Sequence, residues 1–148
     1  MLLRVTPYDD PVVQALEAGV QAEYVLRYGG PDRTPMAPET FAPPAGIFLV
    51  GWDGDVPVAC GGYRQHGPDA EIKRMYVPGE HRRRGYAVQV LVALEDAARA
   101  AGYPRIILET GTAQPEAIAL YTANGYLAIP SFGLYRDSPQ NRCFAKAL

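Results

Sequence analysis

The feature that most constrains the fold is a strand–helix–strand unit at the centre of the chain. Residues 70–77 (AEIKRMYV) have the composition of a strand, and residues 85–101 have the apolar spacing of a helix, which Gly102 is well placed to end. Residues 105–109 (RIILE) form a further strand, whose three consecutive apolar side chains suit burial on both faces of a sheet. The chain is therefore expected to build a sheet against which at least one long helix packs.

The other predicted elements flank this unit on both sides. On its N-terminal side the pattern predicts a strand at 2–5, a helix at 11–27, a loop rich in Gly and Pro at 29–44, and a hairpin of strands at 46–52 and 56–64. On its C-terminal side it predicts a helix at 115–123 and strands at 126–129 and 141–146. The order is β-α-β-β-β-α-β-α-β-β. With 148 residues, no repeat and no linker, we expect one α+β domain over residues 1–148, a mixed and mostly antiparallel sheet with helices in α/β/α layers.

The composition argues against several classes of protein. The formal net charge is −2 and the pI about 5.6, whereas a general binder of duplex nucleic acid is usually basic. No apolar run reaches the roughly 18 residues of a membrane span, and the first residues do not read as a secretion signal. Cys60 and Cys143 belong to no CxxC pair, so we expect buried reduced thiols, no metal site and a cytoplasmic protein. His66 and His81 are expected in exposed turns.

The chemistry is concentrated in residues 70–87 (AEIKRMYVPGEHRRRGYA), where a strand leads into an arginine-rich turn and a helix begins. A helix start offers unpaired backbone N–H groups and the positive end of the helix dipole. Gly85 and the small Ala87 let a bulky anion approach that backbone, and the arginines at 82–84 add positive charge. The segment lacks the Gly-Lys-Ser/Thr ending of a phosphate-binding P-loop and the glycines of a dinucleotide turn. It predicts a pyrophosphate cradle, with a solvated basic turn before an ordinary helix as the alternative.

Three motifs in order carry a resemblance to a known family. The pattern Arg82-x-x-Gly85-x-Ala87 resembles the Arg/Gln-x-x-Gly-x-Gly/Ala signature of the GNAT family of N-acetyltransferases. The preceding strand EIKRMYV and the run LETG…PEAIALYTANGY at 108–126 are similar to that family too, and weaker similarity extends from Gly46 to the closing CFAKAL. The resemblance implies a GNAT-like sheet splayed between the fourth and fifth strands. It also implies acetyl-coenzyme A as co-substrate, without a metal, and an acetyl group moved to a primary amine by direct attack in a ternary complex.

The resemblance also assigns the residues that bind the acetyl donor. The backbone amides of residues 83–88 would hold the pyrophosphate, and the main chain of the strand end would pair with the pantetheine arm as if it were a further strand. Gln114 stands where the family usually has Asn, and its amide would reach the donor on a longer stem. The implied binding residues are Met75, Tyr76, Val77, Arg82, Arg83, Arg84, Gly85, Tyr86, Ala87, Val88 and Gln114.

Acetyl transfer to an amine needs a group that accepts a proton from the amine and one that donates a proton to the departing thiolate. Tyr121 matches the tyrosine that many family members place beside the sulfur, so it is the expected general acid; a core aromatic is the alternative. Glu71 lies 14 residues before Gly85, the spacing of the base in histone-acetylating relatives, and strand alternation would place it on one face with Lys73, Met75 and Val77. A surface carboxylate paired with Lys73 is its alternative role. Glu109 is the reserve base, and a water chain is the third option. A main-chain amide near Tyr76 would stabilise the oxyanion.

The acceptor is less constrained by the sequence than the donor. Tyr24, Tyr28, Gly29 and Gly30 lie at a helix-to-loop junction where family members build the acceptor site, and the segment with Tyr135 and Arg136 would close over it. Three readings stay open: an enzyme, a module of the same fold that binds acyl-CoA or a protein without turnover, and a nucleic-acid binder using the arginines at 82–84. The acidic balance and the lack of a stacking platform argue against the third. The resemblance also leaves room for a homodimer, and the acceptor is a small amine or a protein amino group.

Overall fold

The computed structural model describes all residues from 1 to 148, and its helices and strands follow the predicted order. The strands are β1 (Leu2–Val5), β2 (Ile47–Asp53), β3 (Val56–His66), β4 (Asp69–Tyr76), β5 (Arg105–Gly111), β6 (Leu127–Ile129) and β7 (Asn141–Ala147). The helices are α1 (Pro11–Tyr28), α2 (Tyr86–Ala100) and α3 (Pro115–Ala123), with short 3-10 turns η1 (Pro38–Phe41) and η2 (Gly79–His81). The predicted bounds are correct to within two residues, apart from the two short 3-10 turns, which lie in segments predicted to be loops.

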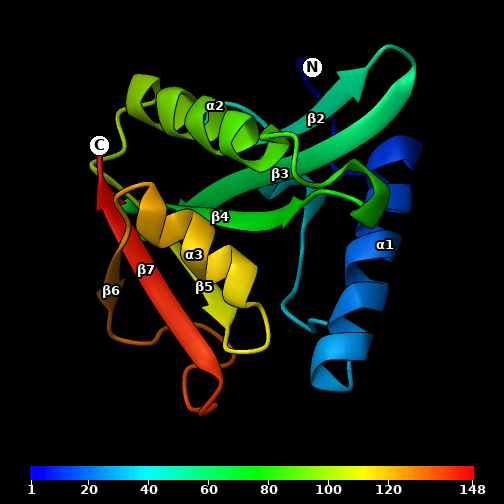
Figure 1. The fold of residues 1–148 in the computed structure, drawn as a ribbon. Coiled ribbons are helices and arrows are strands. Elements are labelled where there is room, and N and C mark those ends of the chain that lie inside the picture. Colours follow the sequence, from blue (N-terminus) through cyan, green and yellow to red (C-terminus); the bar gives the residue numbers. More distant parts are fainter.

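The seven strands form one mixed sheet in the order β1-β2-β3-β4-β5-β7-β6 (Figure 1). Every neighbouring pair is antiparallel except β4 and β5, which are parallel. The parallel ladder is short, since it joins only Ala70 to Ile106 and Glu71 to Ile107 before the strands separate. The predicted splay between the fourth and fifth strands is therefore confirmed, and it leaves the C-terminal half of β4 without a backbone partner on that side.

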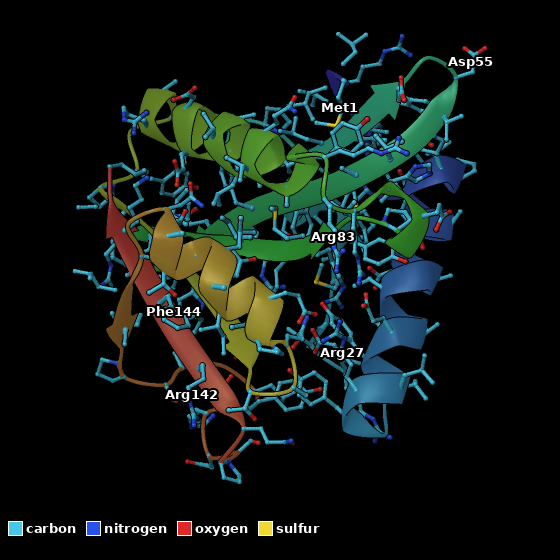
Figure 2. All side chains as sticks on the ribbon, viewed as in Figure 1. Met1, Arg27, Asp55, Arg83, Arg142 and Phe144 are labelled. Carbon is cyan, nitrogen blue, oxygen red and sulfur yellow. The ribbon has the colours of Figure 1, made fainter.

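Helices cover both faces of the sheet (Figure 1). Under α2 and α3 lies a cluster of 14 buried residues that includes Leu91, Leu94 and Ile106. On the other face, α1 and η1 cover a cluster of 7 buried residues that includes Leu16, Phe41 and Phe48. Alternate residues of β2 and β3 contribute to the two clusters, as the period of two along a strand requires. Figure 2 shows the side chains that fill the space between the sheet and the helices.

A β-bulge in β4 inverts its faces halfway along the strand. The register of β3 and β4 shifts where Cys60 and Gly62 pair with Tyr76 and Lys73, and Arg74 there adopts a left-handed backbone with φ of 59°. Glu71 and Lys73 share one face, as predicted. Met75 and Val77 lie on the opposite face, packed against the cluster under α2, so the prediction that they share a face with Glu71 and Lys73 is wrong.

Local signals explain the boundaries of α1. The Asp10 side chain accepts a hydrogen bond of 2.8 Å from the Val12 N–H, and Pro11 follows at the first helical position. Gly29 ends the helix with φ of 80°, a left-handed conformation that favours glycine. No helix of the chain is both long and apolar enough to cross a bilayer. The cysteines are buried and unpaired, and His66 is exposed at the end of β3, whereas His81 in η2 is half-buried, contrary to expectation.

Candidate active site

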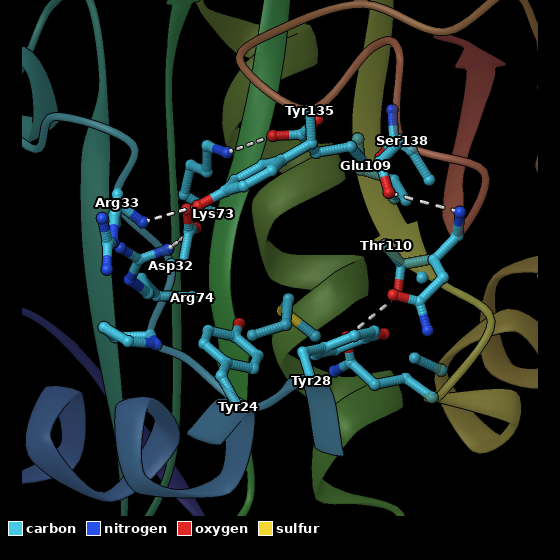
Figure 3. Close-up of a pocket in the computed structure, with 18 of the residues that line it drawn as sticks. Tyr24, Tyr28, Asp32, Arg33, Lys73, Arg74, Glu109, Thr110, Tyr135 and Ser138 are labelled. Atoms are coloured by element: carbon cyan, nitrogen blue, oxygen red, sulfur yellow. Dashed lines mark hydrogen bonds and ion pairs between the residues drawn. The ribbon is translucent and has the colours of Figure 1, made fainter. Parts of the chain in front are cut away.

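A cavity of about 560 Å³ opens where β4 and β5 separate (Figure 3). Its walls come from β4 and β5, the end of α1, the loop after it, the start of α3, and the segment before β7. The cavity therefore uses the gap that the short parallel ladder leaves, and the segments around it come from widely separated parts of the sequence.

One wall of the cavity is a buried ionic cluster. Lys73 Nζ lies 3.0 Å from Glu109 Oε1 and 3.4 Å from Glu71 Oε2, and Glu71 also pairs with Arg64 at 3.1 Å. Glu109 lines the cavity, and its second oxygen, Oε2, is buried beside Gly133 without a hydrogen-bond partner. Glu71 does not line the cavity, and its carboxylate is engaged by Arg64 and Lys73 with His66 nearby. The sequence placed both carboxylates near the site, and the structure leaves unused acceptor capacity only on Glu109.

Arg74 fixes the bulge to the segments on the α1 side. The Arg74 side chain is 2% exposed, and its guanidinium lies 2.8 Å from Glu17 Oε2 in α1 and 2.6 Å from Asp32 Oδ2 in the following loop. Burial opposes ionisation of Asp32, but the charges of Arg74 and Lys73 and the hydrogen bonds from Thr34 together outweigh it and hold the pKa of Asp32 below its usual value. For Arg74, burial acts to lower the pKa, and the carboxylates outweigh it and raise the pKa. The ion pairs thus fix the loop that closes one side of the cavity.

Four tyrosines line the cavity: Tyr24, Tyr28, Tyr121 and Tyr135. Tyr121, on α3, is 6% exposed and packs at a tilt against Tyr126 with ring centroids 5.6 Å apart. Burial raises the pKa of Tyr121, so its hydroxyl stays protonated at neutral pH. Burial likewise raises the pKa of Tyr24 and of Tyr28. The cavity is therefore lined with hydroxyl groups that can donate hydrogen bonds.

Hydrogen bonds join the segments around the cavity. The Tyr28 hydroxyl donates to Gln114 Oε1 at 3.0 Å, and Arg27 donates to the Ala113 carbonyl at 2.7 Å, so the end of α1 is tied to the start of α3. On the opposite side the Arg33 N–H donates to the Tyr135 hydroxyl at 2.7 Å, which joins the loop after α1 to the segment before β7 (Figure 3). Figure 2 shows Arg27 pointing from α1 toward this region.

The start of α2 carries the unpaired N–H groups that the sequence predicted. The first helical hydrogen bond runs from the Gln89 N–H to the Gly85 carbonyl at 3.2 Å, so the N–H groups of residues 83–88 have no helical acceptor. Gly85 has φ of 77° and nothing stands within 4 Å of where a Cβ would lie. Arg83 and Arg84 are exposed, and Figure 2 shows Arg83 where α2 begins, beside the end of β4. Arg82 is held differently, since it donates to the Val77 carbonyl and pairs with Glu23 of α1.

Most of the predicted site residues lie together, and the cavity has further lining residues that the sequence did not indicate. Those that line the cavity are Tyr24, Tyr28, Gly29, Gly30, Met75, Glu109, Gln114, Tyr121 and Tyr135. Tyr76, Val77 and residues 82–88 do not line it; they form the end of β4 and the turn into α2. Asp32, Arg33, Lys73 and Arg74 line the cavity without having been proposed for it. A signal existed for Asp32 and Arg33, since both lie in the loop that follows the predicted acceptor tyrosines.

Comparisons with known proteins agree with this geometry. The acetyltransferase (GNAT) family model matches residues 17–126. Over 99% of its length the chain is 34% identical to an IAA acetyltransferase of Azospirillum brasilense, of which it covers 97%. A solved structure from Klebsiella pneumoniae, assigned as an acyl-CoA N-acyltransferase, has a TM-score of 0.83 at 30% identity, over 99% of this chain and 97% of that one. The chain therefore belongs to the GNAT family of acetyltransferases, and the fold and enzyme class expected from its sequence are confirmed.

The fold is also shared with more distant solved structures. A GNAT family acetyltransferase from Elizabethkingia anophelis, with acetyl-CoA bound, has a TM-score of 0.71 over 99% of this chain and 97% of that one. The two sequences are 14% identical, so this likeness concerns the fold alone.

Proposed function

We propose that residues 1–148 are a single N-acetyltransferase domain that moves the acetyl group of acetyl-CoA to a primary amine by direct attack in a ternary complex. The observation that carries this proposal is the separation of β4 from β5, which opens into a cavity lined by Glu109 and Tyr121. The free N–H groups at the start of α2 lie beside the end of β4, where a thioester donor would enter. That acetyl-CoA is bound in the similarly folded Elizabethkingia protein supports this choice of donor.

The donor is held mainly by main-chain groups in this proposal. Amides of residues 83–88 bind the pyrophosphate, with Arg83 and Arg84 adding charge. The main chain of Met75, Tyr76 and Val77 pairs with the pantetheine arm on the side of β4 that β5 has left. Arg82 contributes by fixing the turn through Val77 and Glu23. The Gln114 carbonyl oxygen is taken by Tyr28, which leaves its NH₂ group for the donor.

Glu109 is our choice as the base, because it lines the cavity and has an oxygen without a partner, whereas Glu71 has neither property. Glu109 takes one proton from the ammonium group of the acceptor, directly or through water, and the free amine attacks the thioester carbonyl carbon. The new N–C bond forms, the C–S bond breaks, and Tyr121 gives its proton to the sulfur. The second proton lost by the nitrogen restores the Tyr121 hydroxyl, and the first leaves Glu109 for solvent. A main-chain amide at Tyr76 or Val77 stabilises the tetrahedral oxyanion.

The test is the release of free thiol from acetyl-CoA in the presence of a panel of primary amines, with calorimetry of coenzyme A binding in parallel. We expect binding of coenzyme A and amine-dependent thiol release with formation of the N-acetyl product. Binding without thiol release by any amine would favour a non-catalytic acyl-CoA-binding module instead. Absence of binding to well-folded protein would overturn the proposal altogether.

We also propose that the domain works in the cytoplasm. Two buried and unpaired thiols, Cys60 and Cys143, support a reducing compartment. Cell fractionation with an antibody to the chain tests the location, and recovery in a secreted or membrane fraction would contradict it.

A further inference from the structure

The ionic side chains near the cavity fall into two groups that no ion pair joins. Arg64, Lys73, Glu71 and Glu109 form the first group, in which two cations face two carboxylates at 3.0 to 3.4 Å. Arg74, Glu17 and Asp32 form the second group, in which one guanidinium holds two carboxylates at 2.6 and 2.8 Å. A buried carboxylate oxygen is costly unless a hydrogen-bond or ionic partner satisfies it.

One carboxylate oxygen in the first group has no partner. The Glu109 side chain is 10% exposed, its Oε1 accepts from Lys73, and its Oε2 is buried and bonded to nothing. Every other carboxylate of the two groups has a guanidinium within 3.1 Å. An acceptor ammonium that enters the cavity would therefore find its counter-charge at Glu109.

A cation without an ion-pair partner, Arg33, also lines the cavity. Arg33 is exposed, lines the cavity, and has no carboxylate within 4 Å of its guanidinium. Its backbone is ordered on both sides, because the Asp32 N–H donates to Gln21 Oε1 at 2.8 Å and the Thr34 N–H donates to Asp32 Oδ1 at 2.9 Å. Figure 3 shows Arg33 and Glu109 on two sides of the pocket, with Tyr135 reaching toward Arg33. The forked guanidinium suits a carboxylate.

We infer that the acceptor is a zwitterion, an amine that also carries a carboxylate, with its ammonium at Glu109 and its carboxylate on Arg33. This inference rests on the proposed function, and it narrows the acceptor from any primary amine to an aminocarboxylic acid. It assigns Arg33 as the residue that distinguishes an amino acid from the amine of the same shape without the acid.

The test uses matched acceptors with and without the carboxylate: phenylalanine against phenethylamine, methionine against 3-(methylthio)propylamine, and lysine against cadaverine. Short ω-amino acids, from β-alanine to 6-aminohexanoate, measure the preferred spacing of the two charges. For the wild type we expect kcat/KM to be at least about 10-fold higher for the best acid than for its matched amine, the range of one charge-assisted contact. In Arg33→Met we expect that ratio to fall toward one through KM for the acid. Arg99→Met removes a distant exposed arginine of α2 as the matched control, and should leave the ratio unchanged.

A second measurement does not depend on turnover. Calorimetry with the coenzyme A complex compares N-acetyl amino acids with the matching N-acetyl amines as product ligands. Tighter binding of the acids, lost in Arg33→Met, supports the inference. The inference is overturned if N-acetyl amino acids and N-acetyl amines bind equally tightly, if only the N-acetyl amines bind, or if no N-acetyl amino acid binds. The same holds if Arg33→Met lowers activity on acids and amines equally. Failure of coenzyme A itself to bind would overturn the proposed function, so the two failures are distinguishable.

Discussion

Lys73 Nζ lies 3.0 Å from Glu109 Oε1, so a buried ion pair joins β4 to β5 just beyond the last residues that the two strands pair, Glu71 and Ile107. Backbone hydrogen bonds no longer hold the strands together there. The side chains instead fix the strands at a set separation, and they fix the Glu109 carboxylate at the edge of the opening. The base that we propose is thereby positioned by the same contact that spans the gap in the sheet.

Glu109→Gln tests this assignment. The amide has nearly the shape of the carboxylate but cannot take a proton from the acceptor, so we expect kcat/KM to fall about 10²- to 10³-fold. The acidic limb of the pH–rate profile should disappear, while the Kd for coenzyme A stays unchanged. Steady-state kinetics of thiol release between pH 5 and 9 and calorimetry measure these effects.

Glu71→Gln is the matched control for that experiment, because Glu71 contacts the same lysine at 3.4 Å. It should lower the thermal midpoint, since Arg64 and Lys73 lose a buried partner, but it should retain the acidic limb. If the limb is lost in Glu71→Gln and kept in Glu109→Gln, the base is Glu71.

Tyr121→Phe removes the proposed proton donor while keeping the ring. We expect turnover to fall about 10²-fold with little change in stability. Because burial raises the pKa of Tyr121, its hydroxyl group should also stay protonated at every pH below 10. Tyrosinate absorbance near 295 nm should then show no difference between wild type and variant until the pH exceeds 10. Unchanged turnover would make Tyr121 a packing residue.

Tyr126→Phe provides the contrasting control. The Tyr126 hydroxyl donates to Glu95 Oε2 at 2.8 Å in the buried core under α3, and Tyr126 does not line the cavity. Loss of this hydroxyl should reduce the free energy of unfolding by about 1.5–3 kcal/mol, the usual value for a hydrogen bond to a charged group, with turnover preserved. Tyr121 and Tyr126 pack against each other in the same part of the fold. Comparing the two Phe variants therefore distinguishes a hydroxyl that serves catalysis from one that serves stability.

The sequence was sufficient for the fold and for the free N–H groups at the start of α2 because both depend on local signals. Residue periodicity set the strands and helices, and the glycine at 85 marked the start of α2. It was insufficient for the bulge, because the register between β3 and β4 is a long-range property and the left-handed residue, Arg74, is not one that favours that backbone.

The same reason explains the choice between Glu71 and Glu109. Spacing from Gly85 singles out Glu71, but spacing does not show which of the two carboxylates already has ion-pair or hydrogen-bond partners for both of its oxygens. That depends on contacts between distant segments, such as Lys73 with Glu109 and Arg74 with Asp32, which lie 36 and 42 residues apart. The unpartnered oxygen of Glu109 can be recognised only when these pairs are known.

Arg74→Lys tests whether the loop after α1 is held by the two-sided geometry of the guanidinium or by its positive charge alone. A lysine can contact either Glu17 or Asp32 but not both in the same geometry, so we expect a loss of about 1–3 kcal/mol in the free energy of unfolding. The KM for the acceptor should rise more than kcat falls. Urea denaturation and kinetics measure both. Arg105→Lys is the matched control, because Arg105 pairs with Asp69 and its side chain is 44% exposed. Its free energy of unfolding should change by no more than about 0.5 kcal/mol.

Asp32 also makes stability depend on pH in a defined direction. Burial opposes ionisation of Asp32, but Arg74, the hydrogen bonds from Thr34 and Lys73 together outweigh it, and the folded pKa lies below the unfolded value of about 3.9. The ionised Asp32 carboxylate therefore contributes to the free energy of unfolding above pH 4, and this contribution is lost as the pH falls through the folded pKa. Urea denaturation of wild type and Asp32→Asn should show a difference at pH 6 that shrinks below pH 4. A difference that stays constant from pH 6 to pH 2.5 would contradict this coupling.

Gly85→Ala tests the anion cradle against a glycine with the same backbone. Gly85 before α2 and Gly102 after it have φ of 77° and 89°, and neither has an atom within 4 Å of an added Cβ. Either substitution should therefore cost about 1–2 kcal/mol of stability from the left-handed backbone alone. Only at position 85 would the new methyl group stand where the pyrophosphate approaches the free N–H groups of α2. We expect Gly85→Ala to raise the Kd for coenzyme A at least about 10-fold and Gly102→Ala to leave it unchanged, by calorimetry at a temperature where both are folded. Equal Kd values in the two variants would mean that the α2 start does not hold the donor.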